Sequence, residues 1–194
     1  VAKSITLRGA GPGITTLQST TTAGNGLILS ADDIGVADMT LGLSAAATAG
    51  QVSLIVTSGA RTSVRNVMFT GFRTAASFVG GSSEVVENVL LTTTNVLATG
   101  LLTSGGRYTG VRLMTSGAGT YNTGFVLAGG ETLSNVSALA ALLDGGYMIR
   151  CGGGVSSVSN SHLQDTGSGT DSGILECTGA GSRGLTVTNT TLRG

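Results

Sequence analysis

Residues 63–71 read Ser63-Val-Arg-Asn-Val-Met-Phe-Thr-Gly71, and the spacing of their apolar residues is the first indication of the secondary structure. Apolar residues cluster over a few positions around an Asn, as at Val64, Val67 and Phe69, and Thr and Gly follow. Short apolar clusters bounded by such residues predict short β-strands separated by turns. A similar stretch, Val85-Val-Glu-Asn-Val-Leu-Leu91, follows 22 residues later, so an internal repeat is the first thing to test.

Two sets of positions recur with a common period of 22–29 residues. The first set is an apolar residue just after a small or turn residue, with spacings of 27, 24, 23, 24, 22 and 27: Leu27, Leu54, Phe78, Leu101, Phe125, Tyr147 and Ile174. The second set is an Asn, Asp or Gly beside a Val-rich strand, with spacings of 28, 22, 22, 25, 25 and 29: Asp38, Asn66, Asn88, Gly110, Asn135, Asn160 and Asn189.

This period accommodates three short strands and three turns, which is one coil of a right-handed, single-stranded parallel β-helix. We therefore predict an all-β solenoid of about seven coils. Equivalent side chains stack in columns in such a solenoid, so the first set predicts an apolar interior column and the second a column at a bend. We expect residues 1–194 to form a single domain. The start at Val1 without Met, and the end inside a strand-like pattern, suggest that it was excised from a longer chain.

Other architectures with repeats fit the sequence less well. A leucine-rich repeat needs a Leu-x-x-Leu-x-Leu frame, which is not found, and the Thr-x-Thr face of an ice-binding solenoid is matched only once, at Thr186 and Thr188. The segment Val136–Leu143 could suggest a helix because of its alanines, but we interpret it as strand and turn.

Composition excludes several further classes of protein. Gly, Ser and Thr make up 83 of 194 residues, 40% of residues are hydrophobic and only 10% are charged. The apolar content is too high for a disordered linker. A net charge of zero gives no electrostatic footprint for nucleic acid or an anionic membrane, and the longest purely apolar stretch, Ala138–Leu143, is far too short to span a bilayer. We expect neither nucleic-acid binding nor membrane insertion.

The first residues of the chain, Lys3-Ser-Ile-Thr-Leu-Arg-Gly-Ala-Gly-Pro-Gly-Ile-Thr-Thr-Leu17, resemble the opening coil of pectin-lyase-like β-helices. The later stretches 63–71 and 85–91 are similar to the Val-x-Asn-Val-x-Phe coils of that superfamily. The resemblance covers nearly the whole chain and implies the fold more than the activity. The superfamily includes polysaccharide lyases, glycosidases, autotransporter adhesins and bacteriophage tailspikes.

Within that superfamily, the charge-poor, hydroxyl-rich composition is most similar to a phage tailspike or tail-fibre segment. The resemblance implies a homotrimer in the virion tail that attaches to bacterial surface polysaccharide. Two alternatives stay open: a polysaccharide depolymerase, either glycosidase or lyase, on the same fold, and a secreted or autotransported bacterial adhesin at the cell surface.

Asp144, Asp165 and Asp171 are the best candidates for an acid and a base if the chain is a depolymerase. Asp144 and Asp171 each come shortly before a first-set strand and are 27 residues apart, so they are expected to stack on adjacent coils, with Asp165 and His162 nearby. A glycosidase needs two close carboxylates with separated pKa values. The alternative is ordinary turn chemistry, since Asp or Asn before Gly is common in turns.

The remaining polar residues favour structural roles. Glu84 and Glu87 are expected to form charge pairs on a solvated face with Arg61, Arg65 and Arg107, and Asp32-Asp33 to form a turn. The Asn column is expected to be a buried ladder at the bend, with each amide bonded to the next. We expect no metal site and no cofactor.

Cys151 and Cys177 are 26 residues apart, as are Arg150 and Glu176. In-register stacking would place the two cysteines in one column and the opposite charges in the next. We expect two free buried thiols, because vertically stacked strand residues are separated by more than the spacing that a disulfide favours.

Overall fold

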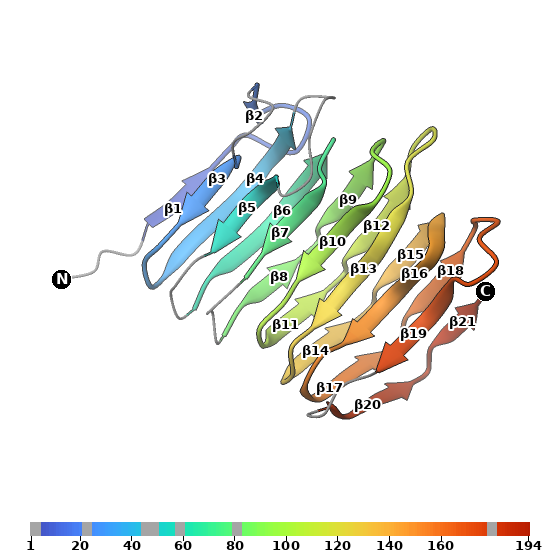
Figure 1. The fold of residues 1–194 in the computed structure, drawn as a ribbon. Helices are drawn as coiled ribbons and strands as arrows, with labels where there is room; N and C mark the ends of the chain where they lie inside the picture. Colours follow the sequence, from blue (N-terminus) through green and yellow to red (C-terminus); the bar gives the residue numbers. More distant parts are fainter. Residues whose placement is uncertain (1–4, 21–24, 44–50, 57–60, 79–82, 178–181) are drawn as a thin grey trace.

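The computed structural model is an all-β parallel solenoid of about seven turns, which confirms the predicted fold class (Figure 1). It describes residues 5–20, 25–43, 51–56, 61–78, 83–177 and 182–194. No helix occurs in these ranges, and hence none that could cross a membrane. The strands at the two ends of the sequence, β1 and β21, lie at opposite ends of the solenoid (Figure 1).

Each complete coil has two arms in one sheet and a third strand in the other. The first arms are β1 (Ile5–Arg8), β8 (Val85–Glu87), β11 (Gly106–Thr109), β14 (Glu131–Ser134), β17 (Gly154–Ser159) and β20 (Ser182–Thr188). The second arms are β2 (Thr16–Ser19), β9 (Leu90–Thr93), β12 (Arg112–Thr115), β15 (Ser137–Ala140), β18 (His162–Asp165) and β21 (Thr191–Arg193). Both arms belong to one strand in β4 (Ile34–Leu43) and β6 (Ser63–Thr70). The third strands are β3 (Leu27–Leu29), β5 (Val52–Val56), β7 (Thr74–Ser77), β10 (Ala98–Leu102), β13 (Tyr121–Leu127), β16 (Leu142–Cys151) and β19 (Gly173–Cys177).

The bend between the two arms is formed by the second predicted set of residues. All seven have left-handed backbone conformations, with φ between 46° and 65°: Asp38, Asn66, Asn88, Gly110, Asn135, Asn160 and Asn189. Asn and Asp tolerate this region because their short polar side chains can hydrogen-bond locally, and Gly has no Cβ to clash. The predicted column at a bend is therefore confirmed at every coil where the sequence placed it.

The first predicted set forms one inward column at four positions and is wrong at Tyr147, which is partly exposed; Phe78 is buried in the core and Ile174 packs against it, but both lie outside that column. Leu27 pairs with Leu54, and Leu101 pairs with Phe125. Leu54 and Leu101 both pair with Ala76, Phe125 pairs with Ile149, and Ile149 pairs with Leu175. The column therefore passes through Ala76, Ile149 and Leu175 and not through Phe78, Tyr147 and Ile174.

The error arises because the third strands do not alternate strictly. In β16, Met148 and Ile149 are adjacent and both fully buried, whereas Tyr147 and Arg150 on either side are partly exposed. The same buried pair occurs in β5, β7, β10 and β13. A side chain at Gly124 would meet the core residue Leu113, so the first member of the pair also faces the interior. A pattern of strict alternation therefore misplaces side chains in this sheet.

Three inward columns form much of the core, and every member from the second coil to the penultimate one is at most 2% exposed. The first arms contribute Val36, Val64, Val86, Tyr108, Leu133 and Val158, the second arms Leu41, Phe69, Leu91, Leu113, Ala138 and Leu163, and the third strands Leu54, Ala76, Leu101, Phe125 and Ile149. The segment predicted as strand and turn at 136–143 contains β15 and the start of β16, which confirms that interpretation.

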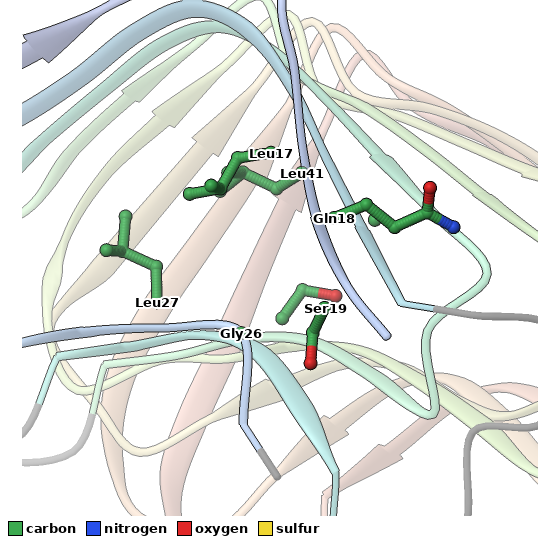
Figure 2. Close-up of a pocket in the computed structure, with 8 residues that line it drawn as sticks. Leu17, Gln18, Ser19, Gly26, Leu27 and Leu41 are labelled. Atoms are coloured by element: carbon green, nitrogen blue, oxygen red, sulfur yellow. The ribbon is translucent and has the colours of Figure 1, made fainter. Parts of the chain in front are cut away.

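The core is uncovered at the first coil. Leu17 stacks on Leu41 in register, but Leu17 is 44% exposed because no coil covers its other side in the described chain. A pocket opens there into the solenoid interior, and Figure 2 shows Leu17 and Leu41 side by side, with Leu27 on another wall and Gln18 pointing away. At the other end Leu192, which stacks on Leu163, is 40% exposed.

Candidate functional site

A surface groove crosses three consecutive coils where second arms lead into third strands. It is lined by residues from three stacked loops: Gly117, Ala118, Gly119 and Thr120; Ala141, Leu142, Leu143 and Asp144; Thr166, Gly167, Ser168, Gly169 and Thr170. Equivalent atoms of neighbouring coils are about 4.8 Å apart, so the groove follows the solenoid axis for about 10 Å. Asp144 is the only ionisable residue among those lining it. Its other polar side chains are the hydroxyls of Thr120, Thr166, Ser168 and Thr170, and alanine, leucine and glycine residues complete the lining.

Asp144 holds the third loop onto the coil below it. Its Oδ1 accepts hydrogen bonds from the Thr170 amide at 3.0 Å, the Thr170 hydroxyl at 3.1 Å and the Asp171 amide at 3.0 Å. These donors, with the Asp171 amide contributing most, hold the pKa of the Asp144 carboxyl below its usual value. The carboxylate is therefore an anion at neutral pH, fixed at the edge of the groove and exposed to solvent.

Asp165 anchors the other side of the same loop. Its Oδ1 accepts from the Leu142 amide at 3.0 Å and the Gly167 amide at 2.7 Å, and its Oδ2 accepts from the Ser172 hydroxyl at 2.6 Å. Both oxygens thus have donors, as in the turn chemistry that the sequence offered as the alternative to catalysis. Asp171 is exposed, and its backbone amide contacts Asp144.

The structure therefore brings all three candidate acids to one loop beside the groove. The stacking of Asp144 under Asp171 is close to the expected arrangement, although Thr170 shares the position. His162 lies in β18 between Ser137 and Thr191 in the outward column of the second arms. Within the described residues, no hydrogen bond or ion pair joins its side chain to the three acids.

The Asn column is exposed rather than buried, which corrects the expected buried ladder. Asn66, Asn88 and Asn135 are exposed at the outer corner of the bend, because a left-handed residue there turns its side chain away from the core. Amide contacts between coils do form, from Asn66 to Asp38 at 3.0 Å and from Asn189 to Asn160 at 3.4 Å.

Charge pairs lie along the outer surface of the first arms. Glu87 pairs with Arg65 at 3.3 Å and with Arg107 at 3.9 Å, as expected from the sequence. Arg61 instead pairs with Asp33, one coil below it, at 2.5 Å. Asp33 has a left-handed backbone, consistent with the predicted turn.

Glu84 does not join this solvated face, and its expected charge pair is wrong. Glu84 is only 1% exposed, as is Glu131, which the sequence analysis did not select. Both lie at the corner where a third strand leads into the next first arm. The sequence holds a sign of this buried corner. Glu131 follows Gly129-Gly130, and Gly105-Gly106 occupies the same corner one coil earlier. Paired glycines of this kind indicate that two backbone segments approach closely.

Cys151 and Cys177 stack in register, as predicted, and so do Arg150 and Glu176, which form an ion pair. The expected free thiols are wrong, because the two cysteines form a disulfide. Their Cα atoms are 4.5 Å apart, which is within the range that a disulfide can bridge, so stacking in adjacent coils is compatible with the bond.

No group of three or more His, Cys, Asp or Glu side chains in the described ranges is arranged to hold a metal ion. Comparison of the chain with protein-family models, curated proteins and solved structures gave no match. The likeness to pectin-lyase-like β-helices and phage tailspikes therefore remains a prediction from the sequence.

Proposed function

We propose that the chain is the β-helical shaft of a surface-attachment protein, a phage tailspike or tail fibre, and that it contacts bacterial surface polysaccharide through the groove beside Asp144. The observation that carries the proposal is the groove itself, which is open, crosses three coils and presents hydroxyl groups and Asp144 beside small and apolar residues. Sugars present hydroxyl groups that both donate and accept hydrogen bonds, so this lining matches their chemistry.

The architecture supports a role as a shaft. Each coil contacts only its neighbours, and the backbone hydrogen bonds run along the axis from coil to coil. Such a solenoid gains length by adding coils without changing its cross-section. Only 10% of the residues are charged. Because salt weakens interactions between exposed charges, contact of such a surface with a dense polysaccharide layer should depend little on ionic strength.

The outer face of the third strands supports a homotrimer. Its two outward columns combine apolar and hydroxyl side chains that are half-buried apart from the buried Thr123 and Ser77: Val52, Thr74, Thr99 and Thr123 in one, and Ile55, Ser77, Leu102 and Val126 in the other. No charged residue interrupts either column until Arg150 and Glu176 in the last two coils. Light scattering of the purified chain should give three times the chain mass of 19.1 kDa.

The test is binding to a panel of purified capsules and O-antigens, measured by calorimetry for the native chain and for Asp144→Asn. The asparagine keeps an oxygen that accepts from Thr170 and Asp171, so the loop stays anchored while the charge is lost. Losing one charge-assisted hydrogen bond should weaken binding about tenfold or more. Glu87→Gln, which removes a carboxylate from another face, is the matched control and should bind normally. Equal affinity of all three proteins for every bound glycan would refute the groove as the contact.

A depolymerase is the second candidate, because Asp144 lines the groove and Asp165 and Asp171 flank the loop 166–170 that also lines it. The two oxygens of Asp165 already accept hydrogen bonds, which is the arrangement of a loop anchor. Release of reducing ends or unsaturated uronates from the same panel distinguishes the two functions. Sugar release that disappears in Asp144→Asn, Asp165→Asn or Asp171→Asn would establish the enzyme and assign the acid.

A further inference from the structure

Two carboxyl groups are buried at the corner between the third strands and the first arms of the middle coils. Glu84 precedes β8, Gly106 begins β11 one coil later, and Glu131 begins β14 in the coil after that. Gly106 pairs with Glu131 in register, and the Arg107 amide donates to the Glu84 carbonyl at 2.7 Å. The two glutamates are therefore members of one column, with a glycine between them.

Glu131 is surrounded by hydrogen-bond donors. Its Oε1 accepts from the Thr103 hydroxyl and from three backbone amides at 2.9–3.1 Å, those of Gly105, Ala128 and Gly129. Its Oε2 accepts from the Gly129 amide at 2.9 Å and the Ser156 hydroxyl at 2.5 Å. Such a set of donors stabilises a buried carboxylate and leaves it no free lone pair for a cation.

Glu84 has almost none of this support. Its Oε1 accepts one long hydrogen bond from Ser104, at 3.4 Å, and its fully buried Oε2 has no hydrogen-bond partner among the residues that the structure describes. The carboxyl lies over Gly106, where a Cβ would be only 2.7 Å from Oε2. Because Gly106 has no side chain, the carboxyl group of Glu84 can occupy this space and extend towards the coil that contains Glu131.

Within the described part of the chain, no positively charged side chain pairs with Glu84. Tyr108 on β11 donates its hydroxyl to the Gly105 carbonyl, at 3.0 Å, and the nearby acidic group is Glu131 on β14, whose charge raises the pKa of Glu84. The guanidinium groups of Arg65 and Arg107, on the neighbouring first arms, are exposed and pair with Glu87. Residues 79–82, which precede Glu84 in sequence, are Val, Gly, Gly and Ser and add no ionisable side chain.

We propose that Glu84 is a proton-binding site, a neutral carboxylic acid that stabilises the stacking of the middle coils in acid and loosens this corner when it ionises. A buried, unpaired carboxylate beside a second carboxylate is strongly unfavourable, and a proton removes its charge without requiring further ligands. A metal ion would need several more oxygens than this corner offers, since Glu131 has none free. Burial, followed by the charge of Glu131, raises the pKa of Glu84 above its ordinary value.

The direction of the pH dependence follows from this shift. A carboxyl whose pKa is raised by folding binds its proton more tightly in the folded state, so folding is favoured most below the ordinary pKa of a glutamate, about 4.3. That stability is lost as the pH rises towards the higher pKa of the folded state. The native chain should therefore lose stability through this group when the pH is raised from about 4 into the neutral range.

The test compares Glu84→Gln with Glu131→Gln by urea denaturation from pH 4 to pH 8. Glu84→Gln imitates the protonated acid, so its urea midpoint should exceed that of the native chain at pH 8 and approach it at pH 4. Glu131→Gln should lower the midpoint throughout, because an amide cannot accept from donors on both of its ends. Glu87→Gln, on the solvated face of the same coil, is the matched control and should leave the pH dependence of the native chain unchanged.

Infrared spectroscopy of the folded proteins gives a second reading that does not depend on how well a variant folds. When the pH is raised from about 4, the carbonyl stretch of one protonated carboxyl group should persist in the native chain after the other carboxyl groups have ionised, and Glu84→Gln should lack this persistent band. Absence of that band in the native chain, or a midpoint for Glu84→Gln that falls below the native value at pH 8, would overturn the assignment of the proton.

Discussion

The left-handed column at the bend gives the sharpest prediction, because one backbone angle recurs at seven positions. Asn135 has a φ of 53°, and its amide donates to the Ser159 carbonyl of the next coil at 3.2 Å. Gly110, one coil earlier, has a φ of 65° and an equivalent bond to Ser134 at 3.1 Å. The column therefore accepts glycine without a change of geometry. The experiment compares the variants Asn135→Gly, Asn135→Ala and Asn135→Val with the native chain.

The expected costs follow from the steric penalty of the left-handed region. A residue with a Cβ loses about 1–2 kcal/mol there, and Asn recovers part of it through local hydrogen bonds. Asn135→Gly should change the free energy of unfolding by less than about 1 kcal/mol, which is the entropic cost of a glycine. Asn135→Ala should cost about 1 kcal/mol and Asn135→Val about 2 kcal/mol, because a β-branched side chain is a genuine outlier at positive φ.

The assay is thermal unfolding followed by circular dichroism. At about 2–4 °C per kcal/mol for a chain of this size, Asn135→Val should lower Tm by about 4–8 °C, and Asn135→Gly should stay close to the native Tm. Thr132 in β14 is exposed, pairs in regular register with Arg107 and Ser157 and has no positive φ, so Thr132→Val is the control and should not be destabilising. If Asn135→Val were as stable as Asn135→Gly, the bend would not impose a left-handed conformation and the reasoning would be refuted.

Two further predictions concern the core and the disulfide. Phe125→Ala removes a fully buried ring from the interior column and should cost about 3–5 kcal/mol, seen as a fall in the urea midpoint, whereas a change below 1 kcal/mol would place the ring outside the core. Reduction of Cys151–Cys177 opens a loop of 26 residues and should cost about 3 kcal/mol, so the double substitution to Ser should match the reduced native chain and resist any further effect of reductant. Thiol labelling of the unreduced, denatured chain should find no free cysteine; two labelled thiols would contradict the bond.

The bend was predictable from sequence because its residue requirement is local. Only Asn, Asp and Gly enter the left-handed region readily, so Asn66, Asn88 and Gly110 mark the coils whatever surrounds them. The interior column of the third strands was less predictable. A strand with two adjacent inward residues breaks the period of two, and this placed Tyr147 rather than Ile149 inside.

The buried carboxyls were out of reach for a different reason. Glutamate is almost never buried without partners, so composition and pattern favour a solvated position for Glu84. What buries it is the space above Gly106 and the donors that hold Glu131, which come from loops far apart in sequence. The three candidate acids were correctly placed near one another. Their hydrogen bonds to the loop of Thr170 and Ser172 required the structure.

Spin-label distances along one outward column test the solenoid most directly. The second arms stack Met68, Leu90, Arg112, Ser137, His162 and Thr191 in consecutive register. At about 4.8 Å per coil, the backbone distance to Thr191 should be about 14 Å from Arg112, about 19 Å from Leu90 and about 24 Å from Met68. A distance that grows by one equal step per coil is the result we predict for labels at these pairs. Distances that do not increase steadily from Arg112 to Leu90 to Met68 would contradict the stacked coils on which the whole account depends.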